Sequence, residues 1–69
     1  MNSKRLGKKI RLARVEQDLT QTQLAQKIGA KQKSISRYEA GKSIPKIGTL
    51  TKLARTLKKP ASYFLEGLE

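Results

Sequence analysis

Residues 20–41 read TQTQLAQKIGAKQKSISRYEAG and contain two short helical patterns joined by a glycine. Thr20 followed by Gln23 has the form of a capping box, in which each side chain satisfies a backbone donor at the start of a helix. A helix is therefore expected to open at Gln21. Gly29 is expected to end it, because glycine readily adopts the positive φ found at helix C-termini.

Another helix, the third along the chain, is expected directly after this turn, over about residues 31–40, with Gly41 as its terminator. Two helices joined by so short a turn must cross at a steep angle, so their contact needs small residues such as Ala25. The shared apolar contact is expected from Leu24, Ile28, Ile35 and Tyr38. Residues 21–40 are therefore predicted to form a helix-turn-helix motif.

The chain before this motif has the pattern of an amphipathic helix. Leu6, Ile10 and Ala13 fall at helical spacing on one face. The opposite side is basic and carries Lys4, Arg5, Lys8, Lys9 and Arg11. Leu12 and Val15 also lie on the polar side, where scattered exposed apolar residues are normal.

Two further helices are expected after the motif. Pro45 disfavours helical geometry at Ile44, and an apolar stripe of core-facing width follows it. This stripe consists of Ile47, Leu50, Leu53, Ala54 and Leu57. Pro60 suits the first position of a short fifth helix that ends near Phe64 and Leu65. No alternating strand pattern occurs, so the predicted class is all-α, a compact five-helix bundle.

Length and cysteine content suggest one small domain spanning residues 1–69. The chain has 69 residues, which leaves no room for a separate effector-binding domain, and it has no Cys and no His to form a disulfide or a zinc site. No secretory signal or membrane-spanning stretch is recognised. We therefore expect a cytoplasmic protein stabilised by helix packing, with dimerisation as a further source of stability.

The charge points to a polyanionic partner. Sixteen Lys and Arg residues oppose five acids, a formal charge of +11, which favours nucleic acid first and an anionic membrane second. Glu16 and Asp18 lie two residues apart, on different helix faces, and neither Ser34 nor Ser36 has a neighbouring His. Without a glycine-rich phosphate loop either, an enzyme is not expected, nor is a cofactor or a metal.

The sequence resembles the Cro/repressor-type helix-turn-helix family of phage and bacterial regulators over nearly its whole length. The matching residues are Leu6-Gly7, Ile10, Arg14, Leu19-Thr20-Gln21, Leu24-Ala25, Gly29, Ile35-Ser36, Glu39, Gly41, Pro45, Leu50, Leu53-Ala54, Leu57 and Phe64-Leu65. The resemblance implies a lambda-repressor-like fold that binds double-stranded DNA. It further implies a transcriptional regulator, most simply a repressor, that inserts the third helix into the major groove.

Four residues of the third helix are candidates for reading bases. Gln32, Lys33, Ser36 and Arg37 share one arc at about 100° per residue, and this arc contains no acid. Gln, Lys and Arg match the edges of adenine and guanine. The resemblance implies that these same four positions reach base edges.

Phosphate contacts are expected from Gln21, Lys31, Lys42 and Lys46. Gln21 opens a helix whose free amides favour an anion, and the resemblance assigns it this role. Lys42 and Lys46 flank the loop after the third helix, which carries the candidate base-reading residues. Lys31, Lys46 and Lys59 stand where the family commonly has a capping Ser, Thr or Asp; phosphate attraction would offset the lost cap at the first two.

Arg14 and Glu39 lie at the edges of the apolar faces of their helices and are expected to pair. The resemblance implies that the residues at these positions form a partly buried ion pair that holds the first helix to the motif. A DNA-binding domain this small needs two copies to specify a DNA site. The third helices of the two copies would lie about 34 Å apart on a near-palindromic sequence. Pro60, Tyr63 and Leu68 are the apolar residues least needed by the monomer core, so they are the predicted dimer interface.

Two other interpretations compete with a double-stranded DNA-binding regulator. A cationic amphipathic membrane-surface binder would share the charge and the basic first helix, but it would not need the specific Gly29 turn or two further apolar helices. An RNA-binding or protein-interaction module could use the same fold. Sequence-specific RNA recognition usually uses stacking aromatics, and Tyr63 is the only aromatic that is not expected to be buried.

Overall fold

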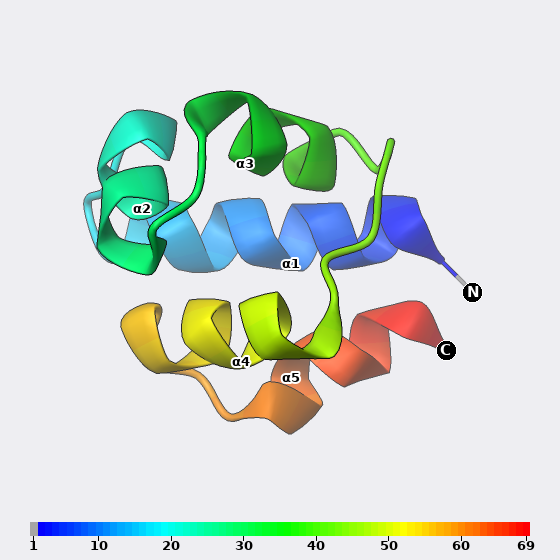
Figure 1. The fold of residues 1–69 in the computed structure, drawn as a ribbon. Helices are drawn as coiled ribbons and strands as arrows, with labels where there is room; N and C mark the ends of the chain where they lie inside the picture. Colours follow the sequence, from blue (N-terminus) through cyan, green and yellow to red (C-terminus); the bar gives the residue numbers. More distant parts are fainter. Residues whose placement is uncertain (1) are drawn as a thin grey trace.

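The computed structural model describes residues 2–69, which form helices joined by short loops (Figure 1). The elements in chain order are α1 (Ser3–Glu16), α2 (Gln21–Ile28), α3 (Gln32–Glu39), α4 (Ile47–Thr56), α5 (Ala61–Leu65) and a 3-10 turn, η1 (Glu66–Leu68). No strand occurs in this described part, so the all-α, five-helix prediction is confirmed. In Figure 1, α1 runs across the middle, with α2 and α3 on one side and α4 and α5 on the other.

The local signals around α2 act as the sequence predicts. The Gln23 backbone N–H donates to Thr20 Oγ1 at 3.0 Å, and the Thr20 N–H donates to Gln23 Oε1 at 2.9 Å, which completes the capping box. At the other end Gly29 has a φ of 69°, the left-handed conformation that glycine adopts without strain. The Ala30 N–H then donates to the Ala25 carbonyl at 2.8 Å, and this bond closes the turn before α3.

The core gathers apolar residues from all five α-helices. Its buried members are Leu6, Ile10, Ala13, Leu24, Ala25, Ile28, Ile35, Leu50, Leu53, Ala54, Leu57 and Phe64. Leu19, Ala30, Tyr38, Tyr63 and Leu68 pack against this cluster and are partly buried. The sequence placed most of these residues correctly, because each helix buries a stripe of period 3.6.

Three expectations about individual residues need correction. Ile47 was expected in the core, but it is 69% exposed, because it is the first residue of α4 and lies at the edge of the stripe whose centre packs against α2 and α5. Tyr38 is half-buried rather than buried, as suits a ring with a polar tip. Pro60 precedes α5 as its N-cap residue rather than opening it; its ψ of 149° is extended, not helical.

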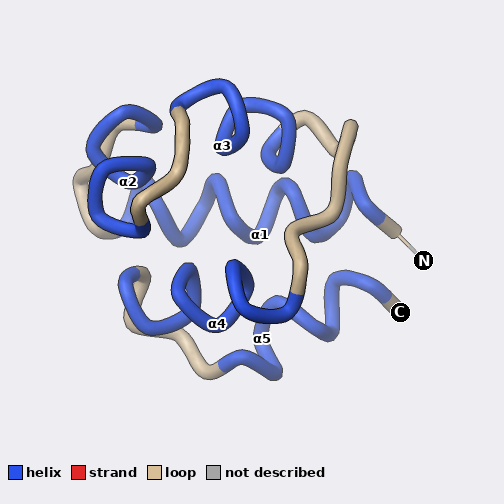
Figure 2. The backbone as a smooth tube through the Cα atoms, viewed as in Figure 1, coloured by secondary structure: helices blue, strands red, loops and turns tan. Residues whose placement is uncertain are grey.

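The longest connection runs from the end of α3 to the start of α4 and carries Lys42 and Lys46 (Figure 2). The start of this loop is tied to α1, because Ser3 Oγ donates to the Gly41 carbonyl at 3.0 Å. Gly41 has a φ of 74°, and a Cβ atom there would lie 2.9 Å from the Cα atom of Lys4. Within residues 2–69, none of the helices combines the length and apolar character that a bilayer-spanning segment requires.

Candidate nucleic-acid interface

A partly buried ion pair joins α1 to α3 beside the helix-turn-helix. Arg14 Nε donates to Glu39 Oε2 at 2.6 Å, and Arg14 Nη2 donates to Glu39 Oε1 at 3.0 Å, so the guanidinium and the carboxylate meet through two parallel bonds. The two side chains are only 13% and 5% exposed. The pair expected from the sequence is therefore present, and both charges are largely withdrawn from water.

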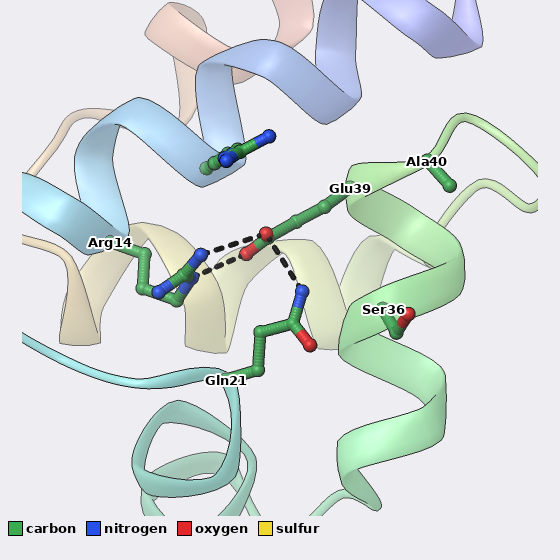
Figure 3. A pocket seen from close by; sticks show the side chains of 6 residues that line it. Arg14, Gln21, Ser36, Glu39 and Ala40 are labelled. Atoms are coloured by element: carbon green, nitrogen blue, oxygen red, sulfur yellow. Dashed lines mark hydrogen bonds and ion pairs between the residues drawn. The ribbon is translucent and has the colours of Figure 1, made fainter.

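Further hydrogen bonds extend this pair towards the surface. Arg14 Nη1 donates to the Leu19 carbonyl at 2.8 Å, and Gln21 Nε2 donates to Glu39 Oε1 at 3.1 Å. Figure 3 shows Arg14 and Gln21 both pointing at the Glu39 carboxylate. The other end of the Gln21 amide accepts a bond from Gln32 Nε2 at 2.7 Å. A continuous series of polar contacts thus runs from the buried pair to the first residue of α3.

Gly7 has a role in this arrangement that the sequence reasoning missed. A Cβ atom at Gly7 would lie 2.6 Å from the backbone carbonyl oxygens of Tyr38 and Glu39, so α1 and α3 touch there through their backbones. Gly7 and Arg14 are seven residues apart and lie on the same side of α1. The close approach at Gly7 therefore helps to bring Arg14 within reach of α3. An isolated glycine inside a helical pattern was the available signal.

The four candidate base-reading residues lie together on the outward part of α3. Gln32, Lys33 and Arg37 are exposed and Ser36 is half-buried. At about 100° per residue, Lys33 and Arg37 lie opposite the buried Ile35, whereas Gln32 and Ser36 lie to one side. The bond from Gln32 to Gln21 shows that this side faces α2. The arc is therefore divided into a cationic outer half and a polar half beside α2.

The four candidate phosphate residues lie at the starts of α2, α3 and α4 and in the loop after α3. Lys31 and Lys46 are exposed N-cap residues of α3 and α4, and neither makes a side-chain capping bond, as expected of Lys. Lys42 is exposed in the loop after α3, where its backbone N–H donates to the Arg37 carbonyl at 2.9 Å. Gln21 differs from the three lysines, since both ends of its side-chain amide already have protein partners.

Acidic residues are almost absent from the part of the sequence that carries the candidate residues. Glu39 is the only acid between Asp18 and Glu66, and it is paired internally. Glu16 pairs with Lys59 Nζ at 3.2 Å, which gives Lys59 a structural role that the sequence did not indicate. Residues 2–69 contain no group of three side chains suited to hold a metal ion.

The candidate dimer residues have mixed surroundings. Pro60 is exposed, whereas Tyr63 and Leu68 are half-buried and pack on the core. Lys9 Nζ lies 4.1 Å and Lys59 Nζ lies 5.0 Å from the centroid of the Tyr63 ring, within cation–π range. Tyr63 therefore already has partners within its own chain, and Pro60 is the most accessible of the three residues.

Comparison with known proteins places these observations in a family. The family model described as helix-turn-helix matches residues 10–64. Multiprotein-bridging factor 1 of Candida albicans is 48% identical over 52 residues, which are 75% of this chain and 34% of that protein. The chain thus spans about a third of the length of this relative.

Solved structures agree with the fold. PlcR of Bacillus thuringiensis, solved with the peptide PapR7 and DNA, superposes with a TM-score of 0.88 and 37% identity over 94% of this chain and 23% of that one. The DNA-binding domain of the P22 c2 repressor superposes with a TM-score of 0.87 and 28% identity, covering 97% of this chain and 88% of that one. Because the family model covers more than half of the chain, this protein belongs to the helix-turn-helix family of the Cro/repressor type.

Proposed function

We propose that this protein is a sequence-specific, double-stranded DNA-binding transcriptional regulator whose α3 enters the major groove. The observation that carries the proposal is the outward face of α3, where Lys33 and Arg37 are exposed while the only acid of the helix, Glu39, is turned inward and paired. PlcR, which shares the fold, was solved with DNA, and the P22 c2 neighbour is a repressor's DNA-binding domain; both support the same role here.

The candidate base-reading residues Gln32, Lys33, Ser36 and Arg37, here called the reading arc, form two halves that suit different base edges. Arg37 and Lys33 project away from the core and can donate to guanine O6 and N7. Gln32 can make the paired bonds that adenine N6 and N7 offer, and its bond to Gln21 holds the side chain beside α2 before DNA arrives. Ser36, at the edge of the arc, can either donate or accept.

Phosphate contacts would fix the register in which α3 reads bases. Lys31 and Lys46 carry exposed cations at the starts of α3 and α4, and Lys42 lies in the loop between these helices. Gln21, as the first residue of α2, adds the free amides of a helix N-terminus. In this proposal these groups, which precede and follow α3 along the chain, hold the DNA backbone while α3 contacts the bases.

We further propose that the protein acts as a cytoplasmic, nucleoid-associated repressor that binds a near-palindromic operator as a homodimer. One α3 spans too few base pairs to specify a site, and two copies about 34 Å apart would read successive turns of one groove. Pro60, Tyr63 and Leu68 form the proposed interface in each subunit, with the exposed Pro60 nearest the partner.

Substitutions of Arg37 and Lys42 test whether base contacts and phosphate contacts are made by different residues. Loss of a bidentate base contact removes about 1–3 kcal/mol of discrimination per half-site, so Arg37→Ala should collapse the ratio of operator to random affinity. Loss of a phosphate contact weakens all duplexes alike and lowers the salt slope by roughly one unit, so Lys42→Ala should preserve the ratio.

The measurements are dissociation constants for a duplex selected from a random pool and for a scrambled duplex, each at several salt concentrations. The selection itself tests the operator symmetry, because a dimer should enrich a near-palindrome. Equal weakening of both duplexes by Arg37→Ala would show that the outward arc does not read bases. That result would refute the proposed mechanism without affecting the fold.

A protein-binding role is the second candidate, because a specific surface favours it. Leu12 and Val15 are 59% and 55% exposed, lie one turn apart on α1, and form an exposed apolar patch on this helix. The 48% identical relative is named a multiprotein-bridging factor. Sequence preference for a duplex over RNA and random DNA at matched salt would favour the first proposal, and its absence would favour the second.

A further inference from the structure

An open hollow of about 290 Å³ lies between α1, the start of α2 and α3 (Figure 3). Its lining residues are Arg11, Arg14, Gln21, Ser36, Glu39 and Ala40. Most of the polar groups in this lining are already satisfied. Arg14 uses Nε and both terminal nitrogens, and the carboxylate of Glu39 accepts from Arg14 and Gln21. The two charges of the pair cancel within the wall of the hollow.

Arg11 is the cation in this lining whose charge is not compensated. It is exposed, and it forms no ion pair with any acid among residues 2–69. Arg11 follows Gly7 by four residues and precedes Arg14 by three, so all three share the side of α1 that faces α3. The hollow therefore carries one net positive charge, and the Ser36 hydroxyl stands on the wall that α3 contributes.

We propose that Arg11 holds a phosphate of the DNA backbone in this hollow, a contact made by α1 rather than by the helix-turn-helix. The inference rests on the DNA-binding role proposed above. The hollow is lined by Ser36, one of the candidate base-reading residues, and by Gln21 at the start of α2. If α3 lies in the major groove, the sugar-phosphate backbone of one DNA strand would therefore pass the opening of the hollow. Arg presents a planar fork of donors that matches phosphate, and the Ser36 hydroxyl can donate to the same group.

Two arginines of α1 give a matched test. Arg5 is also exposed and unpaired among residues 2–69, but at about 100° per residue it lies about 120° around the helix from Arg11. Arg11→Gln and Arg5→Gln therefore remove the same charge from the same helix on different faces. Both sites are exposed, so thermal midpoints should stay within about 4 °C of the wild type. Arg11→Lys, which keeps the charge, serves as the rescue variant.

The measurement is the affinity for the selected and scrambled duplexes between 50 and 200 mM KCl. Each lost phosphate contact should lower the salt slope by about 0.9, so across this range the wild type should lose about 3.5-fold more affinity per bound subunit than Arg11→Gln. Both duplexes should weaken by the same factor. Arg5→Gln should change the slope by less than half as much, and Arg11→Lys should retain most of it.

Three results would overturn the inference. If Arg11→Gln and Arg5→Gln change the slope equally, or neither changes it, Arg11 makes no specific phosphate contact, while duplex binding by the wild type leaves the proposed function intact. If the wild type does not bind duplex DNA at 50 mM salt, both proposals fail. If inorganic phosphate titrates the Arg11 Nε–H signal in NMR at submillimolar concentration while the DNA salt slope is unchanged in Arg11→Gln, the hollow is a small-anion site.

Discussion

Arg14→Ala is the most direct test of what holds the motif to α1. The substitution removes a guanidinium that makes two bonds to Glu39 and one to the Leu19 carbonyl. It leaves the Glu39 carboxylate, which is 5% exposed in the intact pair, with Gln21 Nε2 as its remaining side-chain partner. Breaking a buried pair by removing one member costs about 3–5 kcal/mol, because an uncompensated charge stays in the interior.

The structure favours the lower end of this range. Arg14 is 13% exposed and borders an open hollow, so water can enter and solvate part of the remaining carboxylate. A loss of about 3 kcal/mol is still a large share of the roughly 3–10 kcal/mol expected for a domain of this length. It corresponds to a fall in melting temperature of at least about 12 °C. Glu39→Ala should also destabilise, and the double variant should lose less than the sum of the two.

The assay is urea and thermal denaturation followed by circular dichroism at fixed pH and ionic strength, with duplex affinity measured on the same samples. Arg55→Ala is the control, because Arg55 is an exposed arginine of α4 without an ion pair among residues 2–69; about 1 kcal/mol or less should be lost there. A melting temperature for Arg14→Ala near that of the wild type, together with weaker DNA binding, would refute the structural role and make Arg14 a phosphate contact. Additive losses in the double variant would show that the pair is not coupled.

Two further predictions concern backbone approach and assembly. Gly7→Ala should lower the free energy of unfolding by more than about 1 kcal/mol, because its Cβ atom would lie 2.6 Å from backbone oxygens. Gly48→Ala, which has open space around it, should raise the free energy of unfolding by up to about 1 kcal/mol. Equal melting temperatures for the two variants would contradict this prediction. Pro60→Asp should weaken self-association and cooperative operator binding, and the monomer should still fold because Asp is favoured at the N-cap of α5. Sedimentation unchanged from the wild type would place the interface elsewhere.

Local signals explain why the sequence alone predicted most of the fold. The capping box of Thr20 and Gln23 and the terminators Gly29 and Gly41 act over at most a few residues, so their geometry can be deduced without knowing the rest of the chain. Periodicity then assigns each helix a buried face. It cannot say how far a neighbouring element extends along that face, which is why Ile47, at the very start of α4, was wrongly placed in the core.

The polar contacts around the reading helix depend on something that no short stretch of sequence encodes, the crossing geometry of three helices. Gln21 and Gln32 are eleven residues apart and meet because the turn at Gly29 folds α3 back beside the start of α2. The sequence assigned one of these residues to phosphate and the other to bases. Their hydrogen bond links the two proposed roles, because a substitution of Gln21 would remove the bond that holds the Gln32 side chain beside α2. The side chain of Lys42 is not hydrogen-bonded to Gln32 or Arg37 within residues 2–69, so we expect its substitution to leave in place the side chains that are proposed to read bases.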